Sequence, residues 1–168
     1  PWDGWFVLYL GALAAATADT WSTELGVLAR GRVRSVLTLR TVPAGTSGGA
    51  SLAGTLGGAL GAAVVAAIGL WGSGAWDAIA WDAGALRMLA MLTSAGLVGS
   101  LVDSVLGATL QAQYRCGYCG ADTERRVHCH LPTALVRGRS AVDNDLVNIA
   151  CTLAGAAGGR PVLVSRRG

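Results

Sequence analysis

The stretch from Ala50 to Gly72 reads ASLAGTLGGALGAAVVAAIGLWG and contains 23 residues without a charge. At about 1.5 Å of rise per residue, a helix of this length crosses the hydrocarbon core of a bilayer, which is about 30 Å thick. Its glycines also give two small-xxx-small spacings, which let a neighbouring helix approach closely. These glycines are Gly54, Gly57, Gly58 and Gly61. The stretch therefore predicts a tightly packed transmembrane helix.

Three further apolar runs accompany this one. Met88 to Leu110 carries a single charge, at Asp103, and is also long enough to span a membrane. Gly4 to Ala18 and Leu146 to Gly159 are shorter, so we interpret them as truncated spans or as half-helices that line a site. We expect an all-α fold, a polytopic bundle of transmembrane helices.

The composition favours a membrane protein over a soluble domain. Of the 168 residues, 52% are hydrophobic and 14% are charged, and the mean hydropathy is +0.49. The net charge of +3 comes from arginines between the apolar runs. Retention of positive residues on the cytoplasmic side explains these arginines more simply than nucleic-acid binding. The expected partner is the lipid bilayer, with no nucleic acid.

The loops indicate an orientation in the membrane. Val27 to Thr41 contains four arginines and no acid, which predicts a cytoplasmic loop, and Trp71 to Arg87 predicts an outer loop with aromatic anchors. The four arginines are Arg30, Arg32, Arg34 and Arg40, and the anchors are Trp71, Trp76 and Trp81, accompanied by Asp77 and Asp82. Parity of the spans then places the polar clusters described below on one side.

We divide the chain into three segments. Residues 1–112 contain the first helices and the Arg/Gly loop, residues 113–142 form a cytoplasmic insertion rich in Cys and His, and residues 143–168 contain a C-terminal membrane helix. The start, Pro1-Trp2-Asp3, lacks an initiator Met and a basic region, which argues against a signal peptide. We expect a fragment of a longer membrane protein.

The nonapeptide ADTWSTELG, which starts at residue 18, follows the first apolar run directly. If the run continues as a helix, Asp19 shares a face with Ser22 and Thr23, and Thr20 shares one with Thr23 and Glu24. A carboxylate at a membrane boundary is costly unless it meets a cation, a partner or water. The alternative is a helix end whose polar residues mark where lipid stops.

A second polar cluster lies in the third apolar run. Ser100, Asp103, Gly107 and Gln111 recur at spacings of three and four, so they form one stripe on a helix. An intramembrane Asp can hydrogen-bond to a neighbouring helix, but its burial cost favours pairing with a cation.

The segment TVPAGTSGG, from Thr41 to Gly49, predicts a turn that binds an anion. Pro fixes one turn, and three glycines free the backbone to point several N–H groups at one anion, while the hydroxyls add donors. The segment opens a long helix, whose N-terminus favours phosphate. The candidate binding residues are Gly45, Thr46, Ser47, Gly48 and Gly49. It is not a P-loop, because the Gly-Lys-Ser/Thr ending is missing, and the alternative is a plain turn before a helix.

A third polar cluster precedes the last apolar run. It contains Asp143, Asn144, Asp145 and Asn148, of which Asp145 and Asn148 share a helical face. Cys151 lies within the run itself, and we interpret it as a small buried residue.

The insertion carries a set of soft metal ligands. Cys116 and Cys119 form a Cys-x2-Cys pair, and Cys129 follows, flanked by His128 and His130. Three thiolates and a choice of imidazole are the ligand set of a closed, structural Cys3His zinc knuckle. The alternatives are a redox pair or unliganded cytoplasmic thiols.

Taken together, four motifs resemble a family of integral membrane proteins that includes plant phytyl-phosphate kinase of tocopherol synthesis and human transmembrane protein nineteen. The motifs are ADTWSTELG, VPAGTSGG, GSLVDSVLGAT and DNDLVN, which start at residues 18, 42, 99 and 143 and follow the family's order. The chain is more distantly similar to dolichol kinase and the membrane CTP:phosphatidate cytidylyltransferases. The Cys/His insertion departs from the eukaryotic pattern and suggests a prokaryotic cell membrane.

This resemblance implies nucleotide and magnesium chemistry on a lipid phosphate at the cytoplasmic face. The expected activity is transfer of a phosphoryl group from CTP or another nucleoside triphosphate to a phytyl or other isoprenoid monophosphate. Asp19, Asp103 and one of Asp143 or Asp145 are expected to hold Mg²⁺. The alternatives are an ion-coupled transporter, a lipid-binding membrane protein or a cytidylyltransferase.

The remaining site residues are assigned around this metal. Glu24 joins the acids as a catalytic candidate, and the Gly45 to Gly49 loop is expected to hold phosphates with help from Arg40. Arg137 or Arg139 is expected to assist, and Asn144 and Asn148 complete the nucleotide-binding candidates.

Overall fold

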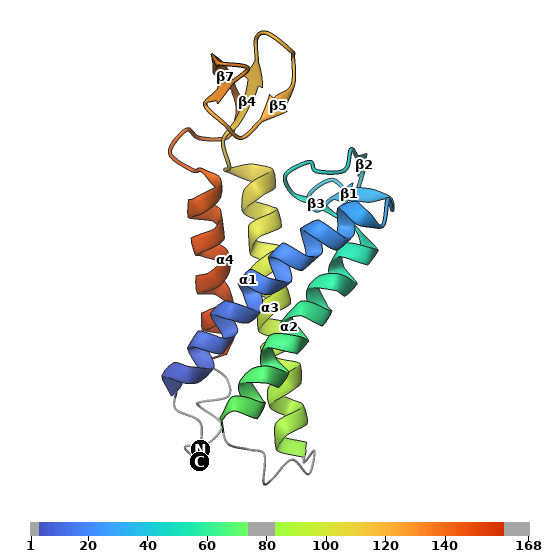
Figure 1. Ribbon diagram of the computed structural model, residues 1–168, viewed down its shortest axis with the longest axis vertical. Helices are drawn as coiled ribbons and strands as arrows, with labels where there is room; N and C mark the ends of the chain where they lie inside the picture. Colours follow the sequence, from blue (N-terminus) through green and yellow to red (C-terminus); the bar gives the residue numbers. More distant parts are fainter. Residues whose placement is uncertain (1–3, 74–82, 160–168) are drawn as a thin grey trace.

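The computed structural model describes residues 4–73 and 83–159. The described part contains four helices, namely α1 (Gly4–Leu28), α2 (Leu52–Gly72), α3 (Ala83–Thr109) and α4 (Asn144–Gly158). Figure 1 shows them as one bundle. Helices α1 and α3 each pack against the other three, so they form its centre. Side chains on these two helices are therefore the ones best placed to meet inside the bundle.

The helices carry small residues on the inside of the bundle and large apolar side chains on the outside. Helix α2 exposes Leu52, Leu56, Leu60, Val64 and Ile68 at every fourth position, while its buried residues are almost all Gly and Ala. A helix in water buries its large apolar side chains, whereas a helix in lipid can expose them without cost. By length and composition, α2 and α3 are able to cross a membrane. This pattern fits a lipid environment.

The glycines of α2 allow the predicted close approach, and the partner is α1. A Cβ atom added at Gly54 would lie 2.5 Å from the carbonyl oxygen of Ser22, and one at Gly61 would lie 3.0 Å from the ring of Trp21. Such distances exclude larger side chains, so the two backbones meet directly. The polar residues of α1 are thereby fixed against the start of α2.

The two shorter apolar runs form helices of different lengths. The first does not end at Ala18, because α1 continues through the polar nonapeptide to Leu28 and is about 37 Å long. The last run forms α4, whose 15 residues extend about 22 Å. Helix α4 is therefore shorter than the bilayer core, in keeping with a half-helix.

The all-α expectation was wrong for the two segments between the helices, which form small antiparallel sheets. The first has the order β2-β1-β3, and the second has the order β5-β4-β7-β6. These strands are β1 (Val33–Ser35), β2 (Thr41–Val42), β3 (Gly49–Ala50), β4 (Gln113–Cys116), β5 (Asp122–Thr123), β6 (Val127–His128) and β7 (Leu131–Arg137). Most are two to four residues long, because each satisfies only a few backbone groups at a turn.

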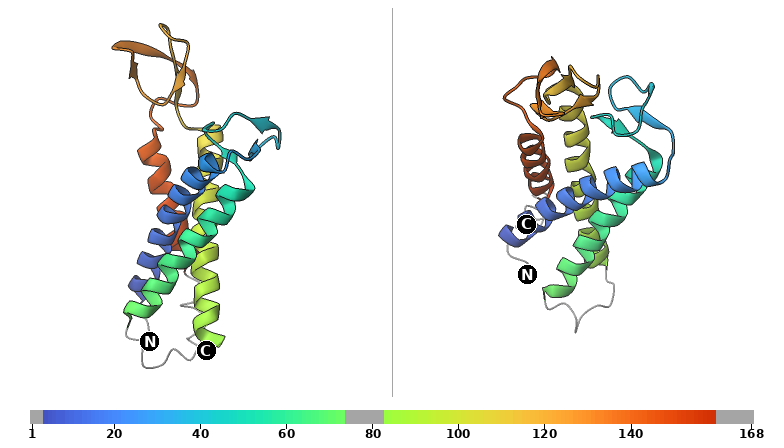
Figure 2. Two further views of the ribbon diagram at one scale, coloured as in Figure 1. Left: turned by 45° about the vertical axis from the view of Figure 1, so that its right-hand side comes forward. Right: turned by 45° about the horizontal axis from the view of Figure 1, so that its top comes forward.

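Both sheets lie at the same end of the bundle (Figures 1 and 2). Helices α1 and α3 end there, and α2 and α4 begin there. The first sheet lies beside the ends of α1 and α2, and the second extends beyond α3 and α4. The three predicted polar clusters are therefore gathered at one end.

The size of the side chains in the core changes along the bundle. Large apolar side chains of α1, α2 and α3 pack together away from the sheets, including Val7, Leu10, Leu70, Met88 and Leu92. Closer to the sheets the buried residues are Ala14, Ala18 and Ala62. Small side chains leave space near the polar end.

Several residues of the orientation argument lie outside the described residues. These are Trp76, Asp77, Trp81 and Asp82.

Candidate functional site

Asp19 and Asp103 meet between the two central helices. Their carboxylate oxygens and the Sγ atom of Cys151, from α4, all lie within 4.8 Å of one another. The Ser100 hydroxyl donates a hydrogen bond to Asp19 Oδ1 at 3.3 Å. Asp103 Oδ2 is buried and has no hydrogen-bond partner within the described residues. A carboxylate oxygen left without a donor next to a second carboxylate is a place for a cation.

A cavity of about 470 Å³ opens onto this acid pair. It unites the first two predicted clusters, since the stripe of Ser100, Asp103, Gly107 and Gln111 forms its wall on α3. The other lining residues include Asp19, Ser22, Thr23 and Gly26 of α1, Gly45 to Gly49 of the turn, Ser51, Gly54 and Thr55 at the start of α2, and Glu124 and Asn144. The predicted face of α1 and the predicted glycine turn thus lie opposite the third span.

The glycine turn has a defined shape. Gly45 and Gly48 have φ angles of +82° and +77°, which side chains rarely adopt. Gly48 also rests on α3, because an added Cβ would overlap the Ala108 side chain and lie 2.7 Å from the carbonyl oxygen of Ser104. The backbone N–H groups of Ser47 and Gly48 have no hydrogen-bond partner within the described residues. The turn therefore presents donors from a fixed backbone.

The two hydroxyls predicted as phosphate donors are engaged within the protein. Thr46 Oγ1 donates to the carbonyl oxygen of Pro43 at 2.7 Å, and Ser47 Oγ donates to Glu124 Oε1 at 2.8 Å. Binding of an anion at this turn therefore relies on backbone N–H groups rather than on these side chains.

Two site residues were missed by sequence reasoning. Glu124 follows β5 and reaches the turn from the Cys/His insertion, 77 residues from Ser47 in the chain. Cys151 is buried, as expected, but its thiol faces the acid pair and donates to the carbonyl oxygen of Ala15 at 3.7 Å. The sequence around Cys151, an apolar run, does not indicate that its thiol faces the acid pair. The sequence around Glu124, a polar loop, does not indicate that this residue reaches the glycine turn.

The cavity is strongly acidic. Asp19, Asp103 and Glu124 line it, and within the described residues its lining contains no Arg, Lys or His. An anionic ligand would be repelled by this lining unless a cation were bound first. The charge pattern of the lining is therefore unfavourable for an anion that arrives alone.

A family comparison now places the chain. The family model described as "Integral membrane protein DUF92" matches residues 2–156. The chain belongs to this family of integral membrane proteins. The match includes every residue of the cavity lining. The expectation of an integral membrane family is thus confirmed.

Two relatives of this DUF92 protein match it over part of their own length. "Protein PGR" of Arabidopsis thaliana is 36% identical over 149 residues, which cover 86% of this chain and 50% of that protein. "Uncharacterized membrane protein MJ0933" of Methanocaldococcus jannaschii is 37% identical over 103 residues, which cover 61% of this chain and 39% of that protein. The chain spans half or less of the length of each of these relatives. No solved structure matches it.

The third polar cluster of the DUF92 chain divides between two cavities. Asn144 lines the first cavity and accepts a hydrogen bond from Gln111 Nε2 at 3.4 Å. Asp143 and Asp145 line a second cavity of about 740 Å³. Asp143 Oδ1 accepts from the N–H of Leu146 at 3.0 Å, so it caps α4. The expected third metal ligand is therefore not grouped with Asp19 and Asp103.

Other expected site residues lie outside both cavities. Glu24, Arg40 and Asn148 are exposed and are absent from both linings. Arg137 has a different partner, since its guanidinium donates to the carbonyl oxygens of Gly107 and Ala108 at 3.0 Å. Because it binds the last turn of α3, Arg137 is a helix anchor rather than a phosphate ligand. Arg139 joins the same region through its backbone N–H, which donates to Leu110.

Four of the five soft ligands in the insertion come together. Sγ atoms of Cys116, Cys119 and Cys129 and a ring nitrogen of His128 lie within 4.8 Å of one another. His130 is exposed and does not join this group. The sequence left the choice of imidazole open, and the structure selects His128.

Proposed function

We propose that the protein is a membrane-embedded phosphotransferase that uses Mg²⁺ to transfer a phosphoryl group from a nucleoside triphosphate to an isoprenoid monophosphate. The observation that carries this proposal is the meeting of Asp19 and Asp103 in one cavity with the Gly45 to Gly49 turn. The acids supply a cation site, and the turn supplies donors for a phosphate. The family match supports the membrane setting.

The residues present fit a magnesium ion. Mg²⁺ prefers carboxylate oxygens and usually binds through one or two of them together with phosphate oxygens of a substrate. Asp103 Oδ2, which lacks a donor within the described residues, and the nearby Asp19 carboxylate are such ligands. The bound ion supplies neutralisation of the charge that develops on the transferred phosphoryl group.

The turn and the helix behind it suit the phosphates. N–H groups of Ser47 and Gly48 face no other acceptor within the described residues. The first residues of α2, Ser51 and Gly54, line the same cavity, so the positive end of that helix points toward it. In the absence of basic side chains from the lining, these backbone groups are the direct phosphate ligands.

A lipid substrate suits the position of the cavity. Leu101 of α3 lines it and is 55% exposed on the outside of the bundle. Val98 and Val105, one turn away on either side, are also exposed. A prenyl chain lying along this apolar strip would have its phosphate at the acid pair. The tail would remain in lipid while the headgroup entered the polar end.

The reaction needs little acid–base assistance from the protein. The attacking group is an oxygen of a phosphate monoester, whose second pKa is about 6, so it is largely ionised at neutral pH. The protein's task is then to position two phosphates and offset their repulsion. A general base is not required, which agrees with the exposed position of Glu24 outside the cavity.

The test is phosphoryl transfer by the purified protein. We expect incubation with labelled CTP or ATP, Mg²⁺ and a prenyl monophosphate to yield prenyl diphosphate, and Asp19→Asn or Asp103→Asn to lower turnover at least about a hundredfold. Glu24→Gln is the matched control, because this acid of α1 lies outside the cavity, and it should retain the wild-type rate. Wild-type turnover by Asp19→Asn or Asp103→Asn would reject the metal assignment.

The acidic lining also favours a second candidate function, an ion-coupled transporter. Acids without bases are expected along a cation pathway. The same purified protein distinguishes the phosphotransferase from the transporter. Cation-driven uptake into vesicles, without phosphoryl transfer from any nucleotide, would support the transporter. Release of pyrophosphate instead of a nucleoside diphosphate would identify a cytidylyltransferase.

A further inference from the structure

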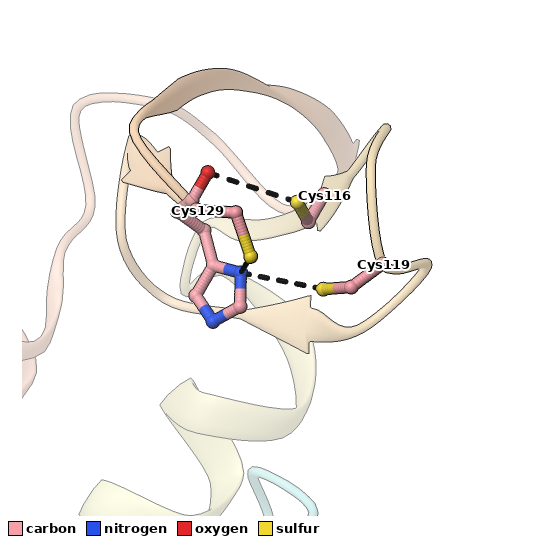
Figure 3. Close-up of side chains that lie close together, drawn as sticks. Cys116, Cys119 and Cys129 are labelled. Atoms are coloured by element: carbon pink, nitrogen blue, oxygen red, sulfur yellow. Dashed lines mark hydrogen bonds between the residues drawn. The ribbon is translucent and has the colours of Figure 1, made fainter.

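The four soft ligands of the insertion are arranged around one point. Figure 3 shows Cys116, Cys119 and Cys129 with their sulfur atoms turned toward one another. Cys119 Sγ and Cys129 Sγ lie 3.5 Å and 3.3 Å from Nδ1 of His128. Tetrahedral zinc, with Zn–S of about 2.3 Å and Zn–N of about 2.0–2.1 Å, separates sulfur from nitrogen by about 3.5–3.6 Å. The distances match the edges of such a tetrahedron.

The backbone adopts an unfavourable conformation to create this arrangement. His128 of β6 pairs with Leu131 of β7, so Cys129 and His130 are the two residues of a tight hairpin. Both have positive φ, at 52° and 60°. Asn-Gly is the usual sequence for such a turn, since other residues are strained there. A ligand that binds His128 and Cys129 would offset this strain.

The chemistry of the cluster suits a soft cation. All three cysteines are free thiols, and their sulfur atoms lie close to one another and to a ring nitrogen of His128. A shared metal ion would offset the repulsion between thiolates brought this close.

We propose that Cys116, Cys119, Cys129 and Nδ1 of His128 bind one Zn²⁺ in a closed structural site, and that this site fixes the position of Glu124. Four protein ligands fill a tetrahedral shell, so no position remains for a substrate. Soft sulfur ligands exclude Mg²⁺ and Ca²⁺, which prefer oxygen.

The connection to Glu124 follows from its place in the chain. Cys119 and His128 bracket the segment that carries it, and both are ligands. This segment pairs with β4 through β5, which is two residues long, and it accepts hydrogen bonds from Thr133 of β7 at the carbonyl oxygens of Arg125 and Arg126. The ion holds both ends of the segment, and Glu124 can then accept the hydrogen bond from Ser47 in the lining of the first cavity. The insertion thereby braces the glycine turn.

Metal content of this 168-residue chain, purified in detergent without added metal, tests the site. We expect about one zinc per chain, lost in Cys116→Ser. His130→Ala is the matched control: it removes an imidazole two residues from His128 that is not part of the group, so zinc should be retained. Folded wild-type protein without zinc, or with a Cys116–Cys119 disulfide, would overturn the proposal.

Proteolysis tests the effect on Glu124 even if Cys116→Ser fails to fold. Arg125 and Arg126 are exposed trypsin sites directly after Glu124. Removal of zinc from the wild-type protein by a chelator should accelerate cleavage there, and added Zn²⁺ should restore protection. Unchanged cleavage would show that the ion does not hold this segment. Neither readout involves phosphoryl transfer, so this inference and the proposed function can fail separately.

Discussion

At the scale of single residues, the role of an aspartate is decided by its partners. Asp122 forms an ion pair with Arg115 at 2.8 Å, and these hydrogen bonds lower the pKa of Asp122. Asp143 caps a helix. Asp103, by contrast, has a buried oxygen without a partner in the described part of the chain. Asp103, with Asp19 beside it, therefore keeps a buried oxygen available for a ligand.

The thiol of Cys151 gives the acid pair a testable preference among metals. Because sulfur binds soft ions, Cd²⁺ should compete with Mg²⁺ better in the wild type than in Cys151→Ser. We expect the Cd²⁺ concentration for half-inhibition of phosphoryl transfer to rise at least about tenfold in Cys151→Ser. The neighbouring Thr152→Val is the control, since that hydroxyl bonds to Ile149. Equal Cd²⁺ sensitivity of all three proteins would place Cys151 outside the metal site.

Sequence reasoning found Asp19 and Asp103 for a physical reason. A charge in an apolar run has a high cost, and helical spacing shows which residues share its face. Glu124 could not be found in this way, because its position depends on the pairing of β4 with β5 and on the close packing of the insertion. Arg137 was misassigned because charge alone does not distinguish a phosphate ligand from a helix anchor.

At the scale of elements, the glycine turn packs against α3 most closely at Gly48. Gly45 and Gly48 share a positive φ, but only Gly48 touches α3, and nothing lies within 4 Å of a Cβ added at Gly45. Gly45→Ala should therefore cost about 1–2 kcal/mol for backbone strain alone. Gly48→Ala should cost about 1–3 kcal/mol more, because its Cβ overlaps Ala108.

Thermal unfolding of the two variants in detergent measures this difference. A larger loss of melting temperature in Gly48→Ala, together with weaker nucleotide binding, is the expected result. Equal melting temperatures would show that the turn does not depend on its contact with α3.

The elements differ in how far the sequence reveals them. Long helices were predictable, because α2 and α3 are long, predominantly apolar runs that a membrane requires to be helical. The sheets were not, since β2 and β3 have two residues each and alternation needs at least four. Their strands are stabilised by pairing across turns, which local sequence does not report.

At the scale of the whole molecule, small residues inside the bundle and large apolar side chains outside it indicate which surface meets lipid. Leu52, Leu60 and Ile68 are 78%, 56% and 58% exposed, although they belong to an apolar helix. In water such a surface would favour aggregation, whereas in a bilayer it is the natural exterior. The polar end with both sheets is then the end that meets water.

This arrangement predicts which sites a membrane-impermeant maleimide reaches. Thr38 and Ser140 are exposed near the first and second sheets, and Gly72 ends α2, about 31 Å from its start. We expect Thr38→Cys and Ser140→Cys to gain label over the wild-type baseline only from the cytoplasmic side, because arginine-rich loops are generally retained on that side. Gly72→Cys should gain label only from the opposite side. Labelling of Thr38→Cys and Gly72→Cys from one side would mean that α2 does not cross the membrane. Labelling of Thr38→Cys only from outside would separate the cavity from cytosolic nucleotides and rule out the phosphotransferase.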